Sequence, residues 1–245
     1  MVQLGLDYST KWGRGYSARL VRNALQSYFM VPYTRYLSTL EVRGIEHIEG
    51  SGPFIFAANH SSNMDTPLVL SALPVHERKR TVVAAAMDNF FMDTRTAIRT
   101  VILFNAIPID RHRVNRRSAQ LALELIEDHW NLIIYPEGGR TPDGRLQEFK
   151  GGAAYLGERT HALVIPTFIH GAGYLQARKY AKAPQFLDGP KRRRHHVVVA
   201  FGPALQSAAD ESIRKFNGRI KDGVVQLGRS VSGDATYGVM PADQV

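Results

Sequence analysis

The sequence of 245 residues contains no cysteine. This absence excludes disulfides, thiolate nucleophiles and cysteine-ligated zinc or iron–sulfur sites, and it fits a reducing compartment. No apolar run approaches the roughly 18 residues that are needed to cross a bilayer. The first 20 residues also lack the continuous apolar core of a signal peptide. We therefore expect a chain that does not cross a membrane by itself.

Acidic residues are outnumbered. The chain has 22 Asp and Glu against 31 Lys and Arg, which gives a net charge of +9. Such a surface favours anionic partners, whether nucleic acid, acidic lipid or a phosphorylated substrate. The basic residues are concentrated in 1–37 and in 177–196, a stretch that contains the run KRRRHH. The alternative interpretation of that run is a solvated loop.

The content of core-forming residues is ordinary. Hydrophobic residues make up 44% and charged residues 22% of the chain, the profile of a folded globular protein. At this length, one domain with an appendage is favoured over two full domains. We expect an N-terminal segment over 1–40, a main domain over 41–230 and a loose tail, poor in aliphatic residues, over 231–245.

Strand candidates recur through the middle of the chain. They are aliphatic or β-branched on both faces, as is typical of strands buried beneath helices. The candidates are 53–58, 81–86, 105–109, 131–135, 162–169 and 196–201, and residues 116–130 carry apolar side chains at helical spacing. The sequence therefore predicts an α/β fold with a largely parallel central sheet flanked by helices. In such sheets, ligand groups collect beyond the carboxyl ends of the strands.

The N-terminal segment predicts a basic amphipathic helix. At 100° per residue, one continuous half of the helix is apolar and the other half is polar. The apolar half holds Leu20, Val21, Ala24, Leu25, Tyr28 and Phe29, and the polar half holds Arg19, Arg22, Asn23 and Gln26. Pro32 is expected to end or kink the helix. Such a helix either lies on an anionic membrane or packs on the core, and both interpretations remain open here.

The first strand candidate ends in a polar corner, FAANHSSNMDTP, over 56–67. It carries a histidine and a carboxylate, His60 and Asp65. One interpretation is a loop followed by a helix whose N-cap is Asp65. The other is a general base oriented by an acid, because a carboxylate that holds Nδ1–H fixes the tautomer and stabilises the imidazolium formed when Nε2 takes a proton.

Further polar residues follow two other strand candidates. Arg111 follows 105–109, and the segment PEGGRT follows 131–135 with Glu137, Gly138, Gly139, Arg140 and Thr141. Two glycines allow a tight turn with exposed N–H groups, and Arg140 offers a planar fork to phosphate oxygens. Lys150 comes soon afterwards. Together these residues predict an anion-binding pocket that contains a base, although each alone is also typical of a surface turn or a solvated charge.

Taken in order and approximate spacing, four segments resemble the sequence blocks of the glycerolipid acyltransferase family. They are NHSSNMD, NAIPIDR, YPEGGRT and VIPTFI, and they span roughly residues 53–170. The family includes the bacterial 1-acyl-glycerol-3-phosphate acyltransferases. The chain departs from the usual blocks at Asn105, where Gly is usual, and at Gly139 and Thr141, where Thr and Ser are commoner.

The resemblance implies a function and a mechanism. His60, oriented by Asp65, would deprotonate a hydroxyl of 1-acyl-glycerol 3-phosphate as that oxygen attacks an acyl thioester, making phosphatidic acid without an acyl-enzyme. Arg111, Arg140 and Lys150 would hold the acceptor phosphate. The acyl donor would be acyl-CoA or acyl carrier protein, with no cofactor and no metal. We expect a cytoplasmic protein that is peripheral on an anionic membrane surface.

Other functions remain as alternatives. The acceptor would instead be glycerol 3-phosphate, another lysophospholipid or a glycolipid hydroxyl, or water would replace it and hydrolyse the thioester. A non-enzymatic alternative uses the +9 charge to hold anionic lipid or nucleic acid. We do not expect nucleic acid as the partner, because the chain lacks the interleaved basic and aromatic residues of single-strand binders.

Overall fold

A computed structural model of the chain describes residues 4–48, 50, 52–111, 116–141, 146–175, 194–235 and 237–238. Of the basic stretch 177–196, only 194–196 belong to these residues, and the rest lies outside them. Among the helices in these ranges, none combines the length and the apolar character that crossing a bilayer requires.

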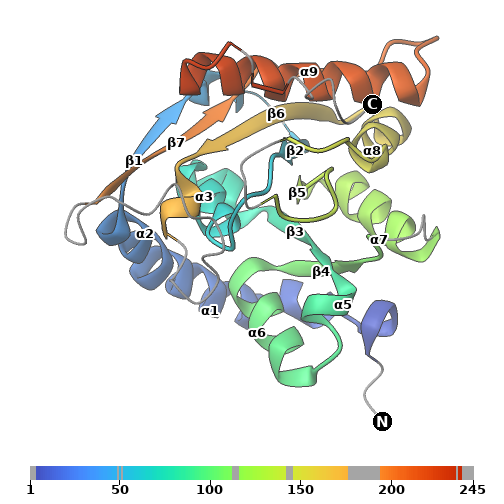
Figure 1. Cartoon of the computed structure of the whole chain (residues 1–245). Coiled ribbons are helices and arrows are strands. Elements are labelled where there is room, and N and C mark those ends of the chain that lie inside the picture. Colours follow the sequence, from blue (N-terminus) through green and yellow to red (C-terminus); the bar gives the residue numbers. More distant parts are fainter. Residues whose placement is uncertain are drawn as a thin grey trace.

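A seven-stranded sheet forms the centre of the described chain (Figure 1). Its order is β1 (Ser38–Arg43), β7 (His195–Phe201), β6 (Leu163–His170), β2 (Phe54–Ala58), β5 (Asn131–Ile134), β3 (Thr81–Ala86) and β4 (Ala106–Ile109). Strands β6 and β7 pair antiparallel, and the other neighbouring pairs are parallel. The predicted α/β fold with a largely parallel sheet is confirmed.

The six strand candidates correspond to β2 through β7, with bounds that shift by one residue at several ends. Strand β1 was not predicted. It is an edge strand in which Leu40 is half-buried and Val42 is exposed, so its residues do not form a continuous apolar run. The predicted helix over 116–130 is observed as α7 (Arg116–Glu127).

Helices cover both faces of the sheet (Figure 1). One face packs against α7, α8 (Gly152–Thr160) and α9 (Ile213–Ser232). The other packs against α3 (Asp65–Ala72) and α6 (Thr94–Phe104), with α1 (Tyr16–Leu25) against α6 and α2 (Val31–Leu37) against α3. The shorter helices are η1 (Gly5–Asp7), η2 (Lys11–Arg14), η3 (Gln26–Met30), η4 (Ile45–Ile48), α4 (Val75–Lys79), α5 (Met87–Phe90) and η5 (Ala172–Leu175).

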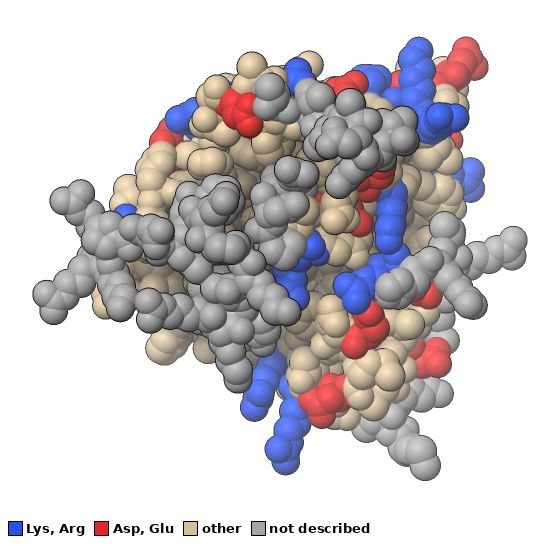
Figure 2. Space-filling view, viewed as in Figure 1, with Lys and Arg blue, Asp and Glu red and all other residues tan. Residues whose placement is uncertain are grey.

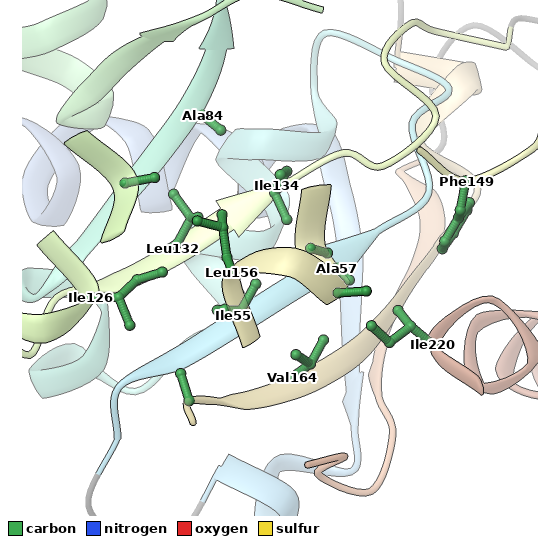
Figure 3. Close-up of a cluster of buried hydrophobic side chains, with 14 of the residues drawn as sticks. Ile55, Ala57, Ala84, Ile126, Leu132, Ile134, Phe149, Leu156, Val164 and Ile220 are labelled. Atoms are coloured by element: carbon green, nitrogen blue, oxygen red, sulfur yellow. The ribbon is translucent and has the colours of Figure 1, made fainter. Parts of the chain in front are cut away.

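The alternation of side chains along β2 supplies both layers of the core. Ile55 and Ala57 point to the layer beneath α7, α8 and α9, which Figure 3 shows around Leu132, Ile134 and Val164. Phe54, Phe56 and Ala58 point to the opposite layer, beneath α3. Because successive side chains of a strand alternate between faces, a central strand that is apolar throughout must be covered on both sides.

Asn105 ends α6 in the left-handed region, with φ of 53°. Gly and Asn adopt this conformation more readily than other residues, which explains physically why Asn serves where the resembling family usually has Gly. The Asn105 side-chain amide also donates a hydrogen bond to the carbonyl oxygen of Thr81 at 3.2 Å. This turn delivers β4 to its place beside β3.

The N-terminal segment forms a nearly continuous helical stretch through α1, the π-helical turn η3 and α2. The π turn ends two residues before Pro32, which lacks the N–H needed for a regular helical hydrogen bond. The polar half of the helix is turned toward the protein: Arg22 is 2% exposed and Gln26 is 3% exposed. The Arg22 Nη1 donates to the Gly13 carbonyl at 2.7 Å, and the Gln26 Nε2 donates to the Leu103 carbonyl at 2.8 Å.

The apolar half of the same stretch faces outward. Tyr28 is 76% exposed and Phe29 is 68% exposed, and the large apolar side chains that are exposed with them are Tyr16, Leu20, Val21, Tyr33 and Tyr36. This arrangement is the reverse of an ordinary surface helix, in which the apolar face covers the core. The alternative that this apolar face packs on the core does not agree with these exposures.

The expected domain boundaries fall within elements of the structure. Residue 40 lies inside β1, and α9 runs through Ser232, past the expected start of the tail. Beyond α9, Tyr237 packs edge-to-face on Phe168, with ring centres 5.1 Å apart. Residues 239–245 of the expected tail lie outside the described residues.

Candidate active site

The carboxyl ends of β2, β4 and β5 bring three loops to one edge of the sheet. The loops that follow β2 and β5 lie side by side in Figure 1, and the Thr141 N–H donates to the His60 carbonyl oxygen at 2.8 Å. Parallel strands end at the same edge, so segments far apart in sequence meet there. Figure 2 shows basic side chains near the middle of the same view, with acidic side chains beside them.

His60 and Asp65 are in direct contact. The His60 Nδ1 lies 2.8 Å from Asp65 Oδ2, with the histidine side chain 20% exposed and the carboxylate fully buried. Because a carboxylate oxygen accepts, Nδ1 carries the proton and Nε2 is left as the basic nitrogen. The sequence-based pairing of these two residues is therefore reproduced by the geometry.

Asp65 is the first residue of α3, whose N-cap is Met64, so the expected N-cap role falls one residue earlier. The carboxylate instead turns back over the loop. Its Oδ2 accepts the backbone N–H groups of Ser61 at 2.7 Å and Ser62 at 2.8 Å as well as the imidazole. These bonds fix the loop and the ring together, which holds the imidazole in one orientation.

Glu137 connects the loop after β2 to the loop after β5. It is buried, and its Oε1 accepts the His60 N–H at 2.8 Å. Its Oε2 accepts the Thr141 hydroxyl and the Gln147 N–H, both at 2.9 Å. Burial raises the pKa of Glu137, and these hydrogen bonds to the carboxylate act in the opposite direction. Both carboxylate oxygens are thus engaged within the protein, and so is the Thr141 hydroxyl.

The glycine turn leaves room for a lysine. Gly138 has φ of 71°, and a Cβ at this position would lie 2.5 Å from the Lys150 Nζ. Lys150 therefore crosses directly over Gly138, and its ammonium donates to the backbone carbonyl of Arg111. A side chain at Gly138 would displace this link between the loop after β4 and the loop after β5.

Two arginines line the cavity, and they differ in the partners that their guanidinium groups have. The Arg140 Nη1 donates to the Asn63 side-chain oxygen at 2.8 Å and remains exposed. Arg111 forms an ion pair with Asp88, at 2.6 Å from Nη2 and 3.0 Å from Nε. The Asp88 and Asn63 contacts were not predicted, because nothing in their local sequence marks them.

Tyr135 is a site residue that sequence reasoning missed. Its ring stacks on the His60 imidazole, with ring centres 4.1 Å apart and planes tilted by 21°. Its hydroxyl lies 2.8 Å from the Thr66 hydroxyl. Burial and, to a smaller extent, the charge of Asp65 raise the pKa of Tyr135. The available signal was an aromatic residue placed directly before the PEGGRT segment.

A cavity of about 350 Å³ opens at His60. Its polar wall contains His60, Asn63, Thr66, Arg111, Tyr135, Gly138, Gly139 and Arg140. Its other wall is largely apolar and comes from β3, β4, α5 and α6, including Phe90, Phe104 and Ile109. A base, cations and an apolar wall therefore share one space. Asp65, Glu137, Thr141 and Lys150 lie behind the polar wall rather than lining it.

Within the described residues, no group of three or more His, Asp and Glu side chains is arranged to hold a metal ion. The groups that these residues offer to the cavity are the His60 imidazole, which can transfer a proton, and the guanidinium groups of Arg140 and Arg111, which can bind an anion.

The family model described as Acyltransferase matches residues 39–170, which is more than half of the chain. A 1-acyl-sn-glycerol-3-phosphate acyltransferase of Limnanthes alba is 30% identical over 135 residues, which cover 54% of this chain and 45% of that protein. The alpha form from Ovis aries is 28% identical over 156 residues, covering 60% of this chain and 51% of the sheep protein. The chain thus spans about half the length of these relatives.

The crystal structure of the 1-acyl-sn-glycerophosphate (LPA) acyltransferase from Thermotoga maritima has a similar fold. The TM-score is 0.66 at 21% sequence identity, and the match covers 92% of this chain and 84% of that one. Because this match covers 92% of the chain, the likeness in fold extends beyond residues 39–170 of the family match.

Proposed function

The chain belongs to the acyltransferase family, and we propose that it moves a fatty acyl group from an acyl thioester to the free hydroxyl of 1-acyl-glycerol 3-phosphate. The product is phosphatidic acid, so the reaction is a step of phospholipid synthesis. The names of the plant and sheep relatives support this acceptor. The donor is acyl-CoA or acyl carrier protein, both of which carry the acyl group on a thiol.

The contact that carries the proposal is the one between His60 Nδ1 and Asp65 Oδ2, at 2.8 Å. Nε2 takes the proton of the acceptor hydroxyl as its oxygen bonds to the thioester carbonyl carbon. Asp65 stabilises the imidazolium that forms. General-base assistance of this kind contributes about 10²–10⁴-fold to the rate.

The second half of the reaction returns the proton. The carbon–sulfur bond breaks, the ester is released, and the imidazolium protonates the departing thiolate. No covalent acyl-enzyme is required, since the acceptor oxygen attacks the thioester directly, and the chain has no cysteine that would form one.

The acceptor phosphate binds at the polar wall of the cavity. Arg140 is exposed and offers its guanidinium directly, and Gly138 and Gly139 line the same wall. Arg111 contributes positive charge while paired with Asp88. Lys150 sets the position of the Arg111 backbone, and Glu137 and Thr141 hold the loop that carries Arg140.

The apolar wall receives the acyl chain of the donor. Phe90, Phe104 and Ile109 face the same space as His60, so a hydrocarbon chain there leaves its thioester beside the base. Apolar lining with few polar groups is typical of such binding cavities.

The proposal is tested by presenting purified protein with labelled acyl-CoA and a set of acceptors. The set contains 1-acyl-glycerol 3-phosphate, glycerol 3-phosphate, a neutral lysophospholipid, a glycolipid and water alone. Transfer to 1-acyl-glycerol 3-phosphate is expected to dominate and to be abolished by His60→Ala. His76→Ala is the matched control, because that histidine is exposed and is not among the residues that line the cavity. Normal turnover by His60→Ala would contradict the mechanism.

The substrates imply a location. A lysophospholipid acceptor resides in a membrane, so the enzyme must reach a bilayer surface. The exposed apolar half of the α1–α2 stretch suits insertion at the interface, with the exposed Arg19 and Arg35 on the same stretch for anionic headgroups. We accordingly assign the protein a peripheral position on the cytoplasmic face of a membrane.

A further inference from the structure

A second cavity, of about 610 Å³, lies at the β1 edge of the sheet. It is formed by the end of α2, the edge strand β1, the end of α3 and the start of α4. Its lining residues are Arg35, Ser38, Thr39, Leu40, Val42, Ile45, Ser71, Ala72, Leu73, Pro74, Val75, Arg78 and Arg194. We refer to it as the arginine cavity. It shares no lining residue with the cavity at His60.

Three arginines and no acidic residue line the arginine cavity. Among the described residues, Arg35 and Arg194 form no hydrogen bond or ion pair, and both are exposed. Guanidinium groups on a surface are ordinarily free to turn into water. Here three of them converge from α2, α4 and the residue before β7, which concentrates positive charge in one hollow.

Arg78 distinguishes this hollow from a solvated surface. The residue is only 7% exposed, yet the sole hydrogen-bond partner of its guanidinium in the described chain is the Ser27 hydroxyl at 3.5 Å. Burial, and then the charge of Arg35, lower the pKa of Arg78. A buried cation without an anionic partner is costly, so an anion in the cavity would relieve both desolvation and repulsion.

A purely structural role for these arginines is not supported by their contacts. Cations often stabilise a helix C-terminus by bonding its last carbonyl groups, and α3 ends at this cavity. None of the hydrogen bonds of the described residues joins Arg35, Arg78 or Arg194 to those carbonyls. The guanidinium groups therefore remain available to a ligand.

The rim of the arginine cavity is apolar. Val42, Ile45 and Val75 line it and are exposed. Arg35 stands on α2 between Tyr33 and Tyr36, both exposed, on the stretch whose apolar half faces outward. A ligand that fits this surface has a compact anionic group for the arginines and hydrocarbon for the rim.

We propose that the arginine cavity is a noncatalytic site for an anionic phospholipid, with the lipid phosphate held by Arg35, Arg78 and Arg194 and the acyl chains lying over Val42, Ile45 and Val75. Arginine forks match phosphate oxygens in bidentate geometry. The site lies at the far end of α3 from Asp65, one helix of eight residues away. A lipid bound there ties the β1 edge to the membrane while the cavity at His60 stays free for substrate.

The test measures binding of dihexanoyl phosphatidic acid, below its micellar concentration, to the full chain by calorimetry. All proteins carry Arg140→Ala, so that phosphate binding at His60 is weakened equally. Adding Arg35→Gln and Arg194→Gln is expected to weaken binding by tenfold or more, since a hydrogen bond to a charged group is lost at each position. Arg99→Gln, an exposed arginine on α6, is the matched control and should leave the affinity unchanged.

Both substituted arginines are exposed, so these variants are expected to fold, and circular dichroism checks this. Arg78→Gln is measured as a third variant and should weaken binding further. Equal affinities with and without the Arg35 and Arg194 changes would overturn the site. Inorganic phosphate and adenosine 3′,5′-bisphosphate are titrated in parallel. If either binds as tightly as the lipid at these arginines, the lipid assignment is wrong.

Discussion

The imidazole of His60 stacks on the phenol ring of Tyr135, with the ring centres 4.1 Å apart. The base is therefore fixed on two sides, by the Asp65 carboxylate at Nδ1 and by an aromatic face. Neither contact lies between residues adjacent in sequence. The Tyr135 contact follows from β2 and β5 being neighbours in the sheet, and the Asp65 contact follows from the turn that begins α3.

Tyr135→Phe should separate the stacking from the hydrogen bond. The ring remains, while the bond between the Tyr135 and Thr66 hydroxyls is lost, at a cost of about 0.5–1.5 kcal/mol in the free energy of unfolding. Turnover should fall only severalfold. Tyr135→Leu removes the stacked ring and should reduce turnover much more. Similar turnover for the two variants would show that the ring does not orient His60.

Tyr135→Phe should also change how the stability of the protein depends on pH in the alkaline range. The folded-state pKa of Tyr135 is raised above its ordinary value of 10.0. Below pH 10 the Tyr135 phenol is protonated and neutral in both the folded and the unfolded chain, and its contribution to the free energy of unfolding is fully present. As the pH rises past about 10 the unfolded chain loses the proton first, so this contribution is lost. Urea unfolding from pH 8 to pH 11 should therefore show a steeper loss of stability for the native chain than for Tyr135→Phe.

Asp65→Asn should lower turnover by about 10²–10⁴-fold, because the amide no longer selects the Nδ1–H tautomer or stabilises the imidazolium. The acceptor KM should change little, since Asp65 does not line the cavity. The pH dependence of kcat should shift as well, and thermal melting should be measured because Asp65 also binds two backbone N–H groups. A folded Asp65→Asn protein with native kcat would contradict the role of the pair.

Glu137→Gln tests whether the Glu137 carboxylate stabilises the loops after β2 and β5. The carboxylate accepts three hydrogen bonds, and an amide would turn its NH₂ group toward one or more of those donors. We expect a loss of about 1–3 kcal/mol in the free energy of unfolding. Thr141→Val, which removes one of the three bonds, is the matched control and should cost less. Thermal melting, followed by circular dichroism, compares the stability of the two variants. A Glu137→Gln melting temperature equal to that of the native chain would show that the Glu137 carboxylate does not stabilise the two loops.

Arg140→Ala should weaken use of a phosphorylated acceptor, since a hydrogen bond to a charged group is worth about 1.5–3 kcal/mol. The loss should appear mainly in KM, as a rise of about tenfold or more. An acceptor that lacks phosphate provides the comparison. Equal losses on the two acceptors would indicate that Arg140 acts through its bond to Asn63 and is structural.

Tyr28→Ser combined with Phe29→Ser should reduce binding to vesicles that contain anionic lipid, because both rings are exposed on the helical stretch proposed to insert. Binding by the native chain should weaken but persist as salt rises, since screening removes the contribution of the arginines and not that of the apolar side chains. Ile213→Ser, on α9 at the other face of the sheet, is the matched control. Native-like vesicle binding by the folded double variant would disprove insertion of this surface.

Local sequence determined much of the fold. The strands β2 to β7 are short apolar runs whose burial on both faces is visible in composition alone, and α7 follows from helical spacing. The same local order placed His60, Arg111 and Arg140 after three strands, and parallel strands end at a common edge. The chemistry of the cavity was therefore predictable as a set of residues.

Tertiary structure decided which partners these residues have. Tyr135 reaches His60, Asp88 reaches Arg111 and Glu137 reaches the His60 backbone only because distant loops are brought into register by the sheet. The sequence likewise did not predict the strand β1 or the outward orientation of the apolar face of the α1–α2 stretch. A helical wheel separates two faces but does not say which one meets the protein, and here buried hydrogen bonds from Arg22 and Gln26 fix that choice.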